Sequence, residues 1–392
     1  MSNKTRVPKL RFKGFQDEWE ENKLENIANI TMGQSPHSIN YTDNPEDEIL
    51  VQGNADLDNG VVKPRIYTTQ VTKESQKGDI ILTVRAPVGE VAMNNFDSVV
   101  LGRGVAGIKG NSYIYTYLQK LFIEEYWSKI SSGSTFQAVN SKDLKVLSLV
   151  LPSSVKEQEK IGKFFATLDK LIELYNRKLK LENVYKNYYI NKVFNSNLKD
   201  NKDYRLGQVT DSRGGTSIEK YFSDNGRYKV ISIGSYGVDN KYIDQGIRAL
   251  DTDVTRSKLL NKNDFAMILN DKTSEANILG RSLLINQDNL FVMNQRTQGI
   301  SLKDNVDIDI NYFYFYLNNP FRKKVIAIAQ GATQIYVNYS AVQNLTVSLP
   351  PLYKQKKIGC LFRIIEQKIN LYEQKIAQLK QLKKAYLQKM FC

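Results

Sequence analysis

With 392 residues the chain is longer than one compact domain usually is, so we expect two or more domains. Its 55 lysines and arginines outnumber the 41 aspartates and glutamates and give a net charge of +14, which favours a polyanionic partner. The start has no apolar signal core, no run of about eighteen apolar residues could span a bilayer, and two cysteines are too few for a disulfide scaffold. We therefore expect a cytoplasmic protein.

The first part of the chain alternates short β-rich runs with glycine and asparagine, which is typical of strands joined by turns. These runs are DEILVQG from Asp47, GDIILTVRA from Gly78 and SVVLGRGVAGIK from Ser98. A helix is expected in YIYTYLQKLFIEEYWSKI from Tyr113, before a further strand-like run that ends at Pro152. Because proline ends a strand and suits the first turn of a helix, a long helix should begin near residue 156.

This long helix has a second copy near the C-terminus. The segment EQEKIGKFFATLDKLIELYNRKL (Glu157 to Leu179) returns as KQKKIGCLFRIIEQKINLYEQKI (Lys354 to Ile376), and in both copies apolar residues recur at alternating steps of four and three, the spacing of a coiled-coil seam. The seam residues are Ile161, Phe165, Leu168, Ile172, Tyr175, Leu179, Ile358, Phe362, Ile365, Ile369, Tyr372 and Ile376. Two matching stripes favour pairing of the helices with each other; the alternative is that each stripe packs on its own domain.

Between the two copies, the polar stretch NSNLKDNKDY from Asn195 predicts a linker. The β-rich runs after it are RYKVISIG from Arg227, DFAMILN from Asp264 and NLFVMN from Asn289, and a helix is expected in INYFYFYLNNPFRKKVIAI from Ile310. The chain is therefore an internal duplication. The expected fold class is α+β, with β-rich domains at 1–155 and 197–352 and long spacer helices at 156–196 and 353–392.

Catalytic motifs are missing from the sequence. It contains no G-x-x-x-x-G-K-[ST] phosphate loop, no dinucleotide fingerprint and no methyltransferase tetrad. The single histidine, His37, has no carboxylate or cysteine spaced to orient it. Asp79 and Glu90 could be arranged as metal ligands of a nuclease, but any β-rich chain offers such pairs. We predict no catalytic residue, no metal site and no cofactor on this chain.

Loops with small and amide side chains occur in both halves instead. MGQSP from Met32 parallels RGGTS from Arg213, the loop from Gly133 parallels that from Gly331, and Arg103 is matched with Arg296. Glutamine and asparagine pair with adenine and arginine with guanine, although the same loops could be ordinary turns. The residues nominated for DNA contact are Gln34, Ser35, Arg85, Arg103, Gln137, Asn140, Arg213, Thr216, Asn270, Lys272, Arg296, Gln334, Tyr336 and Asn338.

Together these features resemble the specificity subunit of type I restriction-modification systems. The resemblance rests on the opening VPKLRFKGFQDEWEENKLENIA, on the two repeated helix segments and on the alternation of divergent and repeated regions, and it covers essentially the whole chain. It implies two target-recognition domains, an antiparallel coiled coil and a non-catalytic subunit that reads bipartite double-stranded DNA, one half-site per domain. The implied partners are two methyltransferase subunits and restriction (motor-nuclease) subunits, which would bind S-adenosylmethionine, ATP and magnesium.

A helix over 157–194 would be roughly 55 Å long at ~1.5 Å per residue. Since DNA rises ~3.4 Å per base pair, two such helices could hold domain centres at most about 16 base pairs apart. Two other hypotheses remain: a single-chain enzyme that cuts or modifies DNA, and a coiled-coil adaptor that reads no sequence.

Overall fold

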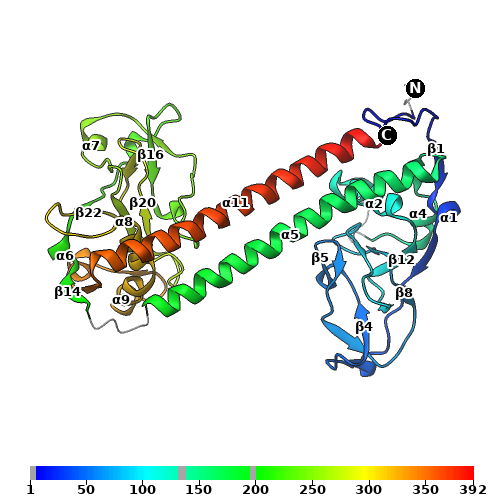
Figure 1. The fold of residues 1–392 in the computed structure, drawn as a ribbon, viewed down its shortest axis with the longest axis horizontal. Helices are drawn as coiled ribbons and strands as arrows, with labels where there is room; N and C mark the ends of the chain where they lie inside the picture. Colours follow the sequence, from blue (N-terminus) through cyan, green and yellow to red (C-terminus); the bar gives the residue numbers. More distant parts are fainter. Residues whose placement is uncertain (1–5, 131–137, 195–199) are drawn as a thin grey trace. The chain divides into compact units, whose positions relative to one another are not determined.

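The structure is a computed structural model that describes residues 6–130, 138–194 and 200–392 (Figure 1). The chain divides into two compact units. The first unit is Met1–Lys178 with Tyr372–Cys392, and the second is Leu179–Leu371. Each unit therefore holds one β-rich domain and a part of both long helices, α5 (Val155–Phe194) and α11 (Leu352–Met390).

The first unit is built on two sheets. One sheet runs in the order β2 (Asn29–Met32), β12 (Val105–Lys109), β9 (Ile80–Thr83), β10 (Val91–Met93), β6 (Val61–Val62) and β5 (Leu57–Asp58). The other runs in the order β3 (Tyr41–Thr42), β7 (Ile66–Thr68), β4 (Glu48–Val51), β11 (Ser98–Leu101) and β8 (Glu74–Gln76). All four residues of β9 are buried, as its continuous apolar run predicts. The strands predicted in this half are confirmed in β4, β9, β11 and β12.

The domain of the first unit also contains an antiparallel pair of strands, β1 (Glu20–Lys23) with β13 (Ser148–Leu151). Its short helices are α1 (Leu24–Ile27), α2 (Ser112–Ile123), α3 (Tyr126–Ile130) and α4 (Ser141–Lys145). The Asn111 side chain caps α2 by accepting the backbone N–H of Tyr113 (3.1 Å) and Ile114 (3.0 Å). The one helix predicted from Tyr113 is interrupted, because Glu125 adopts a left-handed φ of 55° that no helix continues through.

The second unit repeats this plan. One sheet runs in the order β15 (Thr210–Gly214), β22 (Thr297–Leu302), β18 (Phe265–Ile268) and β20 (Ser282–Leu284), and the other in the order β17 (Arg248–Ala249), β16 (Tyr228–Ile231) and β21 (Phe291–Met293). Two further antiparallel pairs are β14 (Lys202–Arg205) with β24 (Thr346–Leu349), and β19 (Asn270–Asp271) with β23 (Ile335–Tyr336). The runs predicted in this half are confirmed in β16, β18 and β21.

The helix predicted from Ile310 forms in three parts. They are α8 (Ile310–Tyr316), a π-helical turn η5 (Leu317–Phe321) and α9 (Arg322–Ala327). The π turn contains Pro320, whose ring and missing N–H disturb regular α-helical hydrogen bonding. The remaining short helices of this unit are α6 (Leu206–Val209), α7 (Asp253–Arg256) and α10 (Tyr339–Val342).

The two long helices pair within each unit. In the first unit the rings of Phe164 and Tyr386 lie 5.0 Å apart and those of Tyr175 and Tyr372 lie 5.9 Å apart, so residue numbers rise along α5 as they fall along α11. In the second unit Lys368 Nζ lies 3.2 Å from Glu182 Oε1, while Phe194 stacks on Phe362 at 5.8 Å. The helices thus form an antiparallel coiled coil, as the resemblance implied.

All twelve seam residues are buried or half-buried. Towards the domains, however, the stripe also packs on strands and short helices. Phe165 and Leu168 belong to one core with Leu149 and Trp19, and Phe362 packs against Phe315 of α8 with ring centroids 4.8 Å apart. Both interpretations of the stripe therefore hold, each over a different part of the helix.

The long helices carry many charged side chains. None of the helices in the described ranges is long and apolar enough to cross a membrane.

Candidate nucleic-acid interface

Three loops meet beyond the C-terminal end of β9 in the first unit. They are residues 33–36, 84–87 and 102–104, which we call the first face. Backbone hydrogen bonds join them: Gly33 N–H donates to Val105 O (3.0 Å) and Val84 N–H donates to Gly104 O (2.9 Å). A Cβ on Gly33 would lie 2.0 Å from the carbonyl oxygen of Gly102, so this close approach of two backbones requires glycine.

A hollow of about 300 Å³ opens in the first face. It is lined by Ser35, Gln52, Gly53, Asn54, Arg85, Ala86, Arg103 and Gly104. It brings together three nominated residues, and Ser35 Oγ accepts a hydrogen bond from the backbone N–H of Arg103 (3.1 Å). The side chains of Arg85 and Arg103 are exposed, and within the described ranges neither has a hydrogen-bond or ion-pair partner. Both guanidinium groups are therefore available to a ligand.

The other nominated residues of the first unit differ in their surroundings. Gln34 is exposed on the first face, and its carbonyl oxygen accepts a hydrogen bond from Thr72 Oγ1 (2.5 Å). Asn140 caps α4, because its Oδ1 accepts the backbone N–H of Lys142 (2.8 Å) and Asp143 (3.1 Å). This cap engages its oxygen and leaves only the amide NH₂ to contact DNA. Gln137 lies outside the described residues.

The second unit builds the same arrangement from residues 215–218, 269–272 and 294–296, which we call the second face. Gly215 N–H donates to Thr297 O (2.8 Å), and Leu269 N–H donates to Arg296 O (2.9 Å). A Cβ on Gly215 would lie 2.0 Å from the carbonyl oxygen of Asn294. Both faces therefore depend on one glycine at the same place in the frame.

The hydrogen bonds fix which positions of the two faces correspond. The Leu269 N–H donates to Arg296 O just as the Val84 N–H donates to Gly104 O. Arg296 therefore takes the place of Gly104, and Gln295 takes the place of Arg103. The sequence match of Arg103 with Arg296 is wrong by one residue. Asn270 takes the place of Arg85, because Asn270 pairs with Tyr336 as Arg85 pairs with Ala138.

Arg213 is engaged by its own domain. Its Nη2 donates to Asp264 Oδ2 at 2.7 Å, and Asp264 also accepts Ser301 Oγ (2.7 Å) and the backbone N–H of Asn261 (2.9 Å). The Asp264 side chain is only 7% exposed, so this ion pair holds the Arg213 side chain of β15 beside the start of β18. Arg213 is therefore tied to a carboxylate, unlike Arg85 and Arg103.

The connection that carries Asn270 and Lys272 is longer than its counterpart. Residues 269–281 join β18 to β20, whereas residues 84–90 join β9 to β10, a difference of six residues. Arg322 holds this loop, since its Nε donates to Leu279 O (2.9 Å) and its Nη2 to Asn277 O (3.2 Å). Burial lowers the pKa of Arg322 to about 10, with the nearby Arg281 charge adding to the effect.

Asp271 organises the start of the same loop. Its carboxylate accepts the backbone N–H of Ile278 (2.7 Å) and Thr273 (3.1 Å). Burial alone would raise the pKa of Asp271, but these hydrogen bonds outweigh it and hold the pKa below its usual range. The loop is thus shaped by its own hydrogen bonds, and Lys272 is exposed on it.

The remaining nominations of the second unit lie on or beside the second face. Thr216 and Asn270 are half-buried, whereas Arg296, Gln334, Tyr336 and Asn338 are exposed. Asn338 occupies the N-cap position of α10 without a side-chain capping bond. Sequence reasoning missed Gln52, Asn54 and Gln295. Gln52 follows β4, and only the parallel pairing of β4 with β11 brings it beside Arg103.

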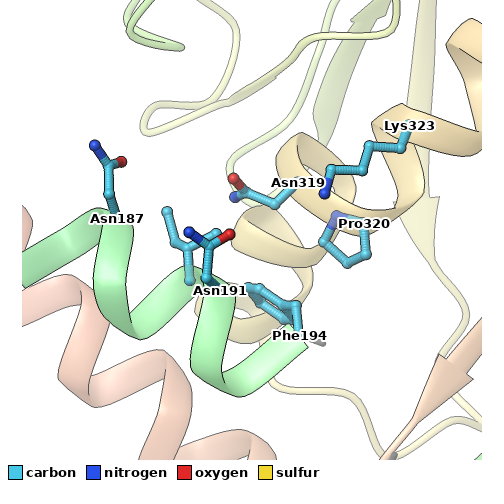
Figure 2. Close-up of a pocket in the computed structure, with 7 residues that line it drawn as sticks. Asn187, Asn191, Phe194, Asn319, Pro320 and Lys323 are labelled. Atoms are coloured by element: carbon cyan, nitrogen blue, oxygen red, sulfur yellow. The ribbon is translucent and has the colours of Figure 1, made fainter. Parts of the chain in front are cut away.

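A second hollow, of about 360 Å³, lies in the second unit where the C-terminal end of α5 approaches η5 and α9. Figure 2 shows the side chains of Asn187, Asn191 and Phe194 from α5 with Asn319, Pro320 and Lys323 from the facing helices. Asn319 donates its amide to Phe315 O (2.7 Å). The lining offers amides and one lysine, without a carboxylate, cysteine or histidine for acid–base or nucleophilic chemistry.

Metal ligands do not gather in the described part of the chain: no group of three or more histidine, cysteine, aspartate and glutamate side chains there could hold an ion. His37 is exposed, and its backbone N–H donates to Gln70 Oε1 (2.9 Å).

Comparisons with known proteins agree with this arrangement. The family model described as the type I restriction modification DNA specificity domain matches twice, at residues 16–183 and 198–381. The MjaIX specificity subunit of a type I restriction enzyme from Methanocaldococcus jannaschii is 24% identical over 95% of this chain and 92% of its own length. The putative MjaX specificity subunit of the same organism is 35% identical, but the match covers only 40% of this chain and 38% of that protein.

Among solved structures, the S subunit of a type I restriction-modification system from M. genitalium has a similar fold. It matches with a TM-score of 0.70 at 16% identity and covers 98% of this chain and 99% of its own. The two matched regions of the family model span most of the chain and coincide with the two repeated halves. The chain therefore belongs to the family of type I restriction-modification DNA specificity subunits.

Proposed function

We propose that the chain is the non-catalytic subunit that reads a bipartite double-stranded DNA target, with one half-site read by each face. One observation carries this proposal: the two faces share a backbone frame but present different side chains. Arg85 and Arg103 on the first face correspond to Asn270 and Gln295 on the second. A common frame with different side chains suits two half-sites of different sequence.

Partner subunits supply the chemistry in this proposal. Two methyltransferase subunits and the restriction subunits bind the chain, and S-adenosylmethionine, ATP and magnesium bind to them. The long helices support a scaffolding role because they expose large apolar side chains, a feature of protein-binding surfaces. They include Leu171, Leu174, Leu181, Val184, Tyr185 and Tyr188 on α5, and Tyr353, Ile364, Leu371 and Leu382 on α11.

The test compares the purified chain with the complex it forms with its methyltransferase subunit. The chain alone, given DNA, magnesium, ATP and S-adenosylmethionine, should neither cut nor methylate, and the complex should methylate. DNA binding by the complex should weaken steeply as salt rises, because phosphate contacts release counterions. Cutting or methylation by the chain alone would replace this proposal with a single-chain enzyme. Binding with no sequence preference would replace it with an adaptor.

A further inference from the structure

The first face presents two arginines where the second face presents two amides. Arg85 and Asn270 occupy one shared position, and Arg103 and Gln295 occupy the other. Because the frame is the same, the chemistry of these positions is set by the side chains themselves. The two half-sites should therefore differ in the base that is read there.

On the first face nothing in the described part of the chain neutralises the two guanidinium groups. The hollow between them is lined by hydroxyl, amide and glycine groups and contains no carboxylate. A Cβ on Gly104 would lie 2.0 Å from the carbonyl oxygen of Gln52, so the wall of the hollow is bare backbone. An unpaired arginine in such a hollow retains its fork of N–H donors, which matches O6 and N7 of guanine in the major groove.

On the second face, amides stand at the equivalent positions and a carboxylate binds one of them. Gln295 Nε2 donates to Glu219 Oε1 at 3.3 Å, and the neighbouring Asn294 Nδ2 donates to the same oxygen at 2.9 Å. Hydrogen bonds from Ser217 and Asn294 hold the pKa of Glu219 below its usual range, so this carboxylate is ionised at neutral pH. The second face therefore offers no arginine fork at these two positions.

We propose that the half-site read by the first unit contains a G·C base pair whose guanine is contacted by Arg85 and Arg103. The second half-site has no such arginine contact at the equivalent positions. This proposal rests on the proposed function. The recognised chemistry is the pair of acceptors O6 and N7 on one base edge. A phosphate contact by the same side chains would give affinity without this base preference.

Arginine-to-lysine variants separate the two kinds of contact, because lysine keeps the charge that a phosphate needs but lacks the bidentate fork. The full chain is co-expressed with its methyltransferase subunit as wild type, Arg85→Lys and Arg103→Lys. Each purified complex methylates a pool of random double-stranded DNA, and the modified sites are sequenced. The control is Arg227→Lys, an exposed arginine of the second unit that is paired with Asp251 outside the second face.

The wild-type complex should yield a bipartite motif with a G·C pair in one half-site. Either lysine variant should reduce the preference for that pair by about 10- to 100-fold and leave the other half-site unchanged. The control should leave both half-sites unchanged. A preference that survives in both lysine variants, or a loss confined to a position that is not G·C, overturns the inference while the proposed function stands. A wild-type complex that produces no bipartite motif overturns the proposed function itself.

Discussion

Replacing Gly33 with alanine should force the loops of the first face apart. The added Cβ would lie 2.0 Å from Gly102 O and 2.8 Å from Val105 O, whereas real Cβ contacts essentially never fall below 3.0 Å. Both neighbours are backbone atoms, so no change of rotamer relieves the clash, and the loops must separate by about 1 Å. Overpacking of this kind costs about 1–3 kcal/mol of unfolding free energy.

Tryptophan fluorescence measures this loss of unfolding free energy in the first unit. Both tryptophans of the chain, Trp19 and Trp127, are buried in the first unit, so denaturation followed by their emission reports on that unit. The matched control for stability is Gly53→Ala; its sequence preference does not serve as a control, because Gly53 lines the hollow of the first face. Gly53 has an extended φ of 177°, and an added Cβ there would meet no heavy atom within 4 Å, so stability should stay within about 0.5 kcal/mol.

The same variant should also weaken reading, because Arg103 follows Gly102 directly and moves with it. Methylation by the Gly33→Ala complex should lose preference in one half-site only, and Gly215→Ala should lose preference only in the other. If Gly33→Ala matches Gly53→Ala in stability and the wild type in sequence preference, the close packing of the loops does not position the side chains that read DNA.

Other perturbations test the helices and the loops. Arg11→Ala should destabilise the first unit by about 3–5 kcal/mol in the tryptophan assay, because it strips the bidentate partner (2.7 and 2.8 Å) from the buried Glu157 carboxylate, while Arg11→Met with Glu157→Leu should recover most of that loss. Seven residues inserted after Lys178 and after Leu371 add one heptad to each helix, about 10 Å or 3 base pairs. The unspecified gap of the methylated motif should therefore lengthen with both half-sites unchanged; an unchanged gap would show that helix length does not set the spacing of the half-sites. The pKa of Asp271 is lower in the folded state, so its ionised carboxylate stabilises the fold above the unfolded-state pKa of about 3.9, and this stabilisation is lost as pH falls through the folded-state pKa. Asp271→Asn should therefore make the free energy of unfolding, followed by circular dichroism, depend less on pH in the acid range.

The helices and strands whose apolar residues follow a clear pattern were predictable from the sequence. α5 begins at Val155 and α11 at Leu352, within one residue of the expected starts, because an apolar stripe and a preceding proline each mark a helix. The strands were found for a similar reason, since β9 and β18 are short apolar runs bounded by turn residues. The domain boundaries as proposed from the sequence stay a prediction.

The site was harder to predict, because its geometry depends on contacts between loops that are distant in the sequence. Arg85, Arg103 and Ser35 do line one hollow, but Gln52 joins them through a strand pairing that no local pattern reveals. Arg213 has a side chain suited to contact DNA and lies in a matching segment, yet it forms an ion pair with Asp264. The type of a side chain can suggest that it contacts DNA, whereas only the fold determines which polar side chains remain without a partner in the protein.

The most direct test of the central claim maps methylated adenines across the genome of cells that carry this chain with its methyltransferase subunit, against cells that lack the chain. Two short half-sites separated by a fixed unspecified gap, present only with the chain, are the predicted result. A stable complex that adds no methylation, or one whose methylated sites share a single continuous motif, would contradict the assignment of one half-site to each face.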